Sequence, residues 1–182
     1  MQRIKKVDAV TAPQKTKDLL AAVKTQMGGV PNLISTMARS PAALAGYLGL
    51  SAGLAGGALD PKLREQIAVA VAGANACDYC ASAHTMLGKK AGVSKDEIER
   101  NLAGASGDAK TAAALAFVVK IVRERGHLTD GNLADIRAAG FSEEEIVEMI
   151  GHTAMNVFTN YFNHIARTEI DFPLVGTTRA AA

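Results

Sequence analysis

The residues most able to do chemistry lie in one short stretch, ACDYCASAH, which runs from Ala76 to His84. It holds the only two cysteines of the 182-residue chain, Cys77 and Cys80, and His84 follows four residues after the second. Two thiols at this spacing can close a disulfide, and a nearby imidazole can keep one of them as the reactive thiolate. The same residue types also bind metal ions, so the spacing leaves both redox and metal chemistry open.

A helix over residues 78–90, ended by Gly92, would bring these side chains together. Cys77 and Cys80 would share one face of its first turn, with Cβ atoms about 5–6 Å apart, close enough for a disulfide after a small adjustment. The unpaired N–H groups at a helix start favour Cys77 as the thiolate, whereas the imidazole of His84 favours Cys80. We predict Cys80 as the nucleophile, because only its sulfur has a base within one turn.

Glu65 is a fourth candidate, because it occupies an apolar helix face. The residues that share this face are Ala68, Val69, Ala72 and Ala76. A carboxylate there is costly unless it finds a hydrogen-bond partner, and a thiol or imidazole on the next helix would provide one. In that position Glu65 could relay protons; an ion pair with Lys62 on the surface is the alternative.

The four candidates could instead form one metal site. A structural zinc site usually includes a second CxxC or an HxxxH-type pair, and the sequence contains neither. A redox centre explains all four residues with one spacing. We therefore predict catalytic roles for Glu65, Cys77, Cys80 and His84, with no metal and no cofactor.

The elements that position these residues are predicted to be helices. No run of Val, Ile, Thr or aromatic residues alternates with period two, and aromatic residues make up only 4% of the chain. We predict one all-α domain over residues 1–182, a bundle of about eight helices with an N-terminal arm over about 1–12 and a frayed tail over about 176–182.

Helix boundaries are marked by proline, glycine and capping residues. Pro at a first turn and Ser or Asp at a cap are typical helix starts, and S-x-x-E is the capping-box pattern. These starts are Pro13, Ser40-Pro41, Asp60-Pro61, Ser94 with Glu97 and Ser142 with Glu145. The predicted segments are 14–27, 30–39, one from 41, 62–76, 78–90, 108–126, 129–140 and one from 143 to about 167.

Composition and charge exclude several classes of partner. The chain is 48% apolar and 21% charged, and its net charge of +2 is spread without a basic cluster, so we predict no binding to nucleic acid. The N-terminal MQRIKKVDAV has no apolar run of signal-peptide length, and the few cysteines fit a reducing cytoplasm.

One uncharged stretch, residues 40–59, is long enough to cross a bilayer but consists mostly of Ala and Gly. Gly49, Gly53 and Gly57 recur every four residues, a spacing that lets helices pack closely within a core or between subunits. We predict a packed helix here and no membrane span.

The spacing Glu65-x11-Cys77-x2-Cys80-x3-His84 resembles the signature of the alkylhydroperoxidase D-like family of the carboxymuconolactone decarboxylase superfamily. The segments MGGVPNLISTMARSPAAL and FTNYFNHIARTEIDFP resemble the flanking regions of its peroxidase-related members. The resemblance covers nearly all the chain except the termini. It implies an all-helical homo-oligomer, commonly a trimer or a hexamer.

The resemblance also implies an antioxidant oxidoreductase, a thiol peroxidase or a disulfide reductase. Cys80 would attack a hydroperoxide and become a sulfenic acid, and Cys77 would resolve it as a disulfide. Glu65 and His84 would relay protons, and a dithiol protein or a small thiol would reduce the pair. The apolar surroundings suggest an organic hydroperoxide. Tyr79 replaces a histidine of the characterised peroxidases, which shortens the relay and favours disulfide reduction or slow peroxide turnover.

Two other functions remain open at this point. One is a lyase like carboxymuconolactone decarboxylase, which shares the fold without a cysteine pair. The other is a non-catalytic oligomeric redox sensor. His127, His152 and His164 have no motif support, and we interpret the His164 region as a polar helix face.

Overall fold

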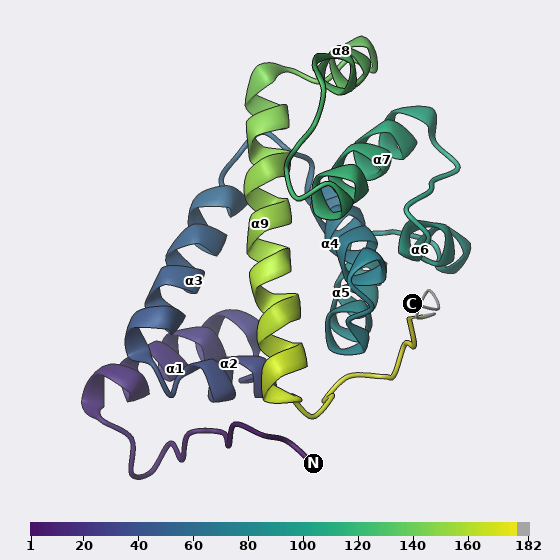
Figure 1. The fold of residues 1–182 in the computed structure, drawn as a ribbon. Helices are drawn as coiled ribbons and strands as arrows, with labels where there is room; N and C mark the ends of the chain where they lie inside the picture. Colours follow the sequence, from purple (N-terminus) through teal and green to yellow (C-terminus); the bar gives the residue numbers. More distant parts are fainter. Residues whose placement is uncertain (178–182) are drawn as a thin grey trace.

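The computed structural model describes residues 1–177, and this part of the chain contains nine helices and no strand (Figure 1). The helices are α1 (Gln14–Met27), α2 (Asn32–Met37), α3 (Pro41–Ala55), α4 (Pro61–Ala74), α5 (Asp78–Lys90), α6 (Lys95–Leu102), α7 (Ala109–Arg123), α8 (Asp130–Ala138) and α9 (Glu143–Ala166). The prediction of an all-α fold is confirmed, with nine helices in the described region where about eight were expected.

The capping residues explain why the helix starts were predictable. The Ser142–Glu145 box forms in full at the start of α9. The box at α6 forms only in part: Ser94 accepts a hydrogen bond from the Glu97 N–H, but the Glu97 side chain does not return to Ser94. That carboxylate instead accepts hydrogen bonds from Gln66, Asn101, Ser106 and Gly107. The loop after α6 supplies donors that the local pattern did not reveal.

Helix α9 runs through the middle of the molecule, with α3 on one side and α4, α5 and α7 on the other (Figure 1). Helix α4 is the most enclosed, with an unbroken buried run over residues 66–72. Its Gly73 is required by a close approach, because a Cβ atom there would overlap the carbonyl of Leu102 at the end of α6. One apolar cluster joins α4, α7 and α9, and a second joins α1 to α5 and includes both cysteines.

Helix α3 is uncharged, yet Leu44 is its one buried residue. A Cβ atom at Gly49 or Gly53 would meet nothing within 4 Å, so these two glycines serve no close packing inside the described chain. Gly57, by contrast, faces the carboxylate of Glu148. No helix among residues 1–177 is long and apolar enough to cross a membrane.

After α9 the chain turns back across the first turn of α5. Val175 N–H donates to Ser82 Oγ at 2.9 Å, and Thr177 N–H donates to Asp78 Oδ1 at 2.8 Å. Thr177 belongs to the predicted frayed tail, and the rest of that tail, 178–182, lies outside the described residues. This C-terminal segment therefore lies directly beside the CxxC motif.

Candidate active site

A tight turn between α4 and α5 sets the position of both cysteines. The N–H of Ala76 bonds to the carbonyl of Gly73 (3.1 Å), and the N–H of Cys77 bonds to that of Ala72 (2.9 Å). This pattern ends α4 with Ala76 in a left-handed conformation (φ 53°), where glycine is the usual residue. Cys77 then caps α5, so that Cys77 and Cys80 share its first turn as the sequence predicted.

The two thiols are free, buried and in contact with each other. Each cysteine is only 2% exposed, and the two side chains are close enough for the thiol of Cys77 to lower the pKa of Cys80. Two residues of α9 complete the surroundings of Cys80: Asn163 Nδ2 donates to its Sγ at 3.3 Å, and Thr159 Oγ1 lies 3.9 Å from it. Helix α9, about 80 residues away in sequence, therefore supplies the Cys80 sulfur with a donor, Asn163, and with an acceptor, Thr159 Oγ1.

These contacts give the two thiols different acidities: Cys80 is the more acidic and Cys77 the less acidic. The hydrogen bond from Cys77 lowers the pKa of Cys80 to about 6, against an opposing effect of burial, and His84, Asn163 and Asn160 lower it further. The pKa of Cys77 is raised by its hydrogen bond with Cys80 and by burial. These shifts favour Cys80 over Cys77 as the thiol that ionises.

Glu65 and His84 form an ion pair at one end of the motif. Glu65 Oε2 lies 2.8 Å from His84 Nδ1, and the two side chains are 25% and 24% exposed. Burial lowers the pKa of His84, but the charge and hydrogen bond of Glu65 outweigh it and raise that pKa overall. Within residues 1–177 no hydrogen bond joins His84 to Cys80, so the imidazole acts on the sulfur through its charge.

Tyr79, which lies between the two cysteines in sequence, contacts two other parts of the chain. Its hydroxyl donates to Asp171 Oδ1 (2.9 Å) and accepts from the Leu33 N–H (3.0 Å), and its ring packs edge-on against Phe172. Burial raises the pKa of the Tyr79 hydroxyl above the ordinary value of tyrosine. The Tyr79 hydroxyl thus links α5, which carries it, to α2 and to the C-terminal segment through two hydrogen bonds.

Two separate cavities reach the motif. One, of about 420 Å³, has a mainly apolar wall from α1 to α5 and α9 that includes Glu65, His84 and Tyr47. The other, of about 530 Å³, is lined by Cys77 and by residues at the end of α9 and in the C-terminal segment. The ion pair and Cys77 can therefore be approached from different spaces.

The sequence did not reveal the buried polar face of α9. His152, Asn156, Thr159, Asn160 and Asn163 are each at most 5% exposed. Their spacing of three or four residues places them on one side of the helix, facing the motif. This spacing was a signal in the sequence, but it does not distinguish a buried polar face from a solvated one. His164, by contrast, is exposed and bonds to the carbonyl of Asn75.

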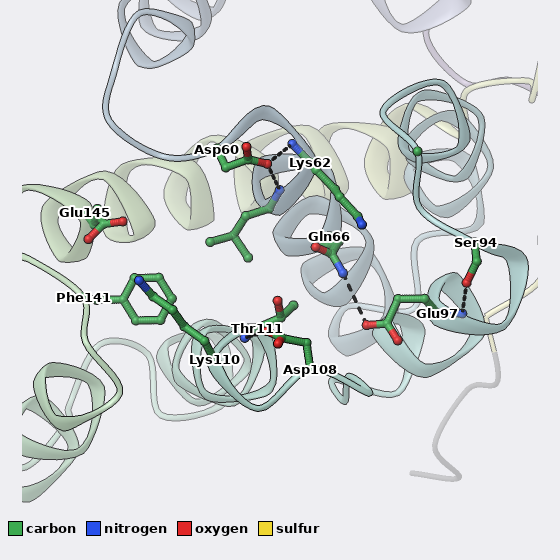
Figure 2. Close-up of a pocket in the computed structure, with 12 residues that line it drawn as sticks. Asp60, Lys62, Gln66, Ser94, Glu97, Asp108, Lys110, Thr111, Phe141 and Glu145 are labelled. Carbon is green, nitrogen blue, oxygen red and sulfur yellow. Dashed lines mark hydrogen bonds between the residues drawn. The ribbon is translucent and has the colours of Figure 1, made fainter.

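A larger hollow of about 610 Å³ lies between α4, α6 and α7, away from the thiols (Figure 2). Its carboxylates serve the local structure: Asp60 caps α4, Asp108 caps α7, and Glu97 accepts a hydrogen bond from Gln66. In the described region no group of three or more His, Cys, Asp or Glu side chains is arranged to hold a metal ion.

Comparison with known proteins gives one family match. The sequence model of the carboxymuconolactone decarboxylase family matches residues 41–124, which include all four motif residues. A comparison with curated protein sequences gives no match.

Three solved structures share the fold. An uncharacterised peroxidase-related protein with the alkylhydroperoxidase AhpD core, from Ralstonia eutropha JMP134, is 20% identical with a TM-score of 0.85, covering 93% of this chain and 92% of that one. A peroxidase-related protein from Silicibacter sp. TM1040 is 22% identical with a TM-score of 0.79, covering 91% and 88%. A cysteine-to-alanine variant of the debrominase Bmp8 in complex with 2,3,4-tribromopyrrole is 21% identical with a TM-score of 0.77, covering 92% and 91%. The family model thus matches the part of the chain that holds the motif, and the three solved structures share the fold of this chain over 91–93% of its length.

Proposed function

We propose that this chain is a thiol-dependent oxidoreductase that reduces organic hydroperoxides or disulfides, with Cys80 as nucleophile and Cys77 as resolving cysteine. Family and fold support a peroxidase-related or a lyase-like role. The observation that favours thiol chemistry is the pair of free, buried thiols on the first turn of α5, with Asn163 donating to Cys80 Sγ at 3.3 Å. In these surroundings the pKa of Cys80 is lowered to about 6 and that of Cys77 is raised. The first step needs a thiolate at neutral pH, and the resolving residue must keep its proton until its turn.

In the first half of the cycle, the Cys80 thiolate attacks the distal oxygen of a hydroperoxide. The O–O bond breaks, the sulfur is oxidised to a sulfenic acid, and the alkoxide takes a proton and leaves as an alcohol. We assign that proton to His84, whose protonated form is favoured by Glu65. With a disulfide substrate, Cys80 would attack a sulfur atom instead and release a thiolate.

In the second half, Cys77 attacks the oxidised sulfur of Cys80. An S–S bond forms, and the hydroxyl group leaves as water with the proton of Cys77. A dithiol protein or small thiol then attacks Cys77, which lines the 530 Å³ cavity, and Cys80 leaves as the thiolate. Its low pKa makes it the better leaving group of the two. A second thiol of the reductant releases Cys77, in the reducing cytoplasm that the sequence predicts.

The test is peroxide-driven oxidation of a dithiol, measured with wild type, Cys80→Ser and Cys77→Ser. Wild type should lose both titratable thiols after one equivalent of cumene hydroperoxide. Cys80→Ser should be inactive, and Cys77→Ser should accumulate a sulfenic acid that a dimedone reagent traps on Cys80. Unchanged turnover in Cys80→Ser would refute the proposal.

The two alternatives make different predictions for the same variants. A lyase would turn over a lactone acid even with both cysteines replaced by serine. A non-catalytic sensor would form the disulfide without turnover and change its assembly between the reduced and oxidised states. Subunit mass measured by light scattering in both states separates this sensor from an enzyme.

We also propose that the chain works as a homo-oligomer, a trimer or a hexamer, through apolar residues of α3 and α9. These neighbouring helices leave Leu50, Val147, Ile150, Phe158, Tyr161 and Ile165 between 44% and 66% exposed. Exposed apolar area of this kind is typical of a surface that another chain covers. A monomeric mass at micromolar concentration would contradict this.

A further inference from the structure

His152 is a buried side chain that the proposed reaction leaves without a task. It lies on α9, is 4% exposed, and lines the 420 Å³ cavity whose wall also contains Glu65 and His84. Among residues 1–177, its Nε2 atom finds no hydrogen-bond partner. Because a buried polar atom without a partner is costly, the atom calls for a group that the described chain does not supply.

The charged neighbours of His152 are unable to fill that role. Arg64, Glu148, Glu65 and His84 are the charges that act on it. Glu148 accepts two backbone N–H bonds from the loop between α3 and α4, and Arg64 donates to the last carbonyls of α3. Glu65 and His84 are paired with each other. Every nearby charged side chain is thus held by another partner.

The state of the imidazole suits it to bind a neutral ligand. Burial, followed by the charge of Arg64, lowers the pKa of His152 and so favours the neutral ring. A neutral imidazole offers one donor and one acceptor. The rest of the wall is mostly apolar, and its volume lies within the range of small-molecule sites.

We infer that His152 is the specificity-determining residue of this cavity: its imidazole hydrogen-bonds the polar group of a neutral organic ligand whose apolar body fills the space between α1, α3 and α5. The inference rests on the proposed function, since the cavity that holds the ligand also contains the Glu65–His84 pair. It adds a positioning residue that neither the family motif nor the redox cycle requires. His152 acts by selecting and orienting the substrate, and takes no part in the sulfur chemistry.

The test compares two probes that differ by one hydroxyl group, cumyl alcohol and cumene, in binding to the full chain. Affinities are measured by calorimetry in the Cys80→Ser background, so that binding is independent of redox activity. In His152→Leu, the ratio of alcohol to cumene affinity should fall about 3- to 10-fold, the value of one hydrogen bond. His152→Gln should keep part of the ratio. His127→Leu, which changes an exposed histidine outside the cavity, should leave it unchanged.

Two further readouts separate positioning from a structural role. With Cys80 intact, His152→Leu should raise KM for cumene hydroperoxide about 3- to 10-fold with kcat within about 2-fold. Its melting temperature should equal or exceed that of wild type, because a buried unpaired atom is removed. An unchanged affinity ratio, or a fall in melting temperature in both His152→Leu and His152→Gln, would overturn the inference. Inactivity of wild type with normal probe binding would refute only the proposed redox cycle.

Discussion

The hydrogen bond between the two thiols is predicted to be the main reason that Cys80 ionises at neutral pH. Cys77→Ala removes that donor and leaves His84, Asn163 and Asn160 in place. A hydrogen bond to a charged group contributes about 1.5–3 kcal/mol, and one pKa unit corresponds to about 1.4 kcal/mol. The pKa of Cys80 should therefore rise from about 6 to about 7–8. The thiolate fraction at pH 7 should fall from about nine-tenths to between about one-half and one-tenth.

The assay is the pH dependence of the rate at which iodoacetamide alkylates Cys80, followed by mass spectrometry. Cys77→Ser is the matched control, because its hydroxyl can still donate to the sulfur, and its midpoint should stay close to that of wild type. If Cys77→Ala alkylates with an unchanged midpoint, the thiol–thiol hydrogen bond is not the dominant cause. The start of α5 or the charge of His84 would then account for the acidity.

Three further changes test neighbouring contacts. Glu65→Gln should lower the pKa of His84, because the charge and hydrogen bond of Glu65 raise it, and NMR titration of the imidazole measures this effect. Peroxide turnover should fall about 100-fold, as measured by steady-state kinetics. Tyr79→Phe should lower the free energy of unfolding by about 1–2 kcal/mol with little change in kcat, because the hydroxyl links Leu33 to Asp171. A large loss of kcat would instead give the hydroxyl a role in proton transfer. Glu148→Ala should destabilise the fold by about 1–2 kcal/mol near neutral pH in urea unfolding, since two backbone N–H groups lose their acceptor. Those bonds lower the pKa of Glu148, so its contribution is present above the ordinary carboxyl pKa and is lost as the pH falls through the lowered value; a deficit that does not shrink in acid would contradict this.

The parts of the fold that the sequence predicted are those encoded by neighbouring residues. Asp60 accepts hydrogen bonds from the first N–H groups of α4, and Ser142 and Glu145 close a complete capping box on α9. The first turn of α5 places the two cysteines on one face for the same reason, since helix geometry alone fixes that arrangement. Local spacing was therefore sufficient for helix starts and for the motif.

The contacts that the sequence did not predict depend on packing between distant segments. Asn163 reaches the Cys80 sulfur only because α9 packs against α5, and Tyr79 meets Asp171 only because the chain turns back after α9. The carboxylate of Glu97 accepts a hydrogen bond from Gln66 of α4 and does not close the capping box with Ser94. His152 belongs to no sequence motif. What distinguishes it is that its Nε2 atom has no hydrogen-bond partner among residues 1–177, and only the structure shows this.

The near absence of burial on α3 has a thermodynamic consequence. A helix with one buried residue contributes little apolar stabilisation to a single chain, and its remaining apolar area becomes favourable only when something covers it. If that cover is another copy, unfolding and dissociation are linked by mass action, and the melting temperature rises with protein concentration. Dilution would then weaken the wall of the 420 Å³ cavity, to which α3 contributes Tyr47 and Leu48, before it unfolds the rest of the molecule.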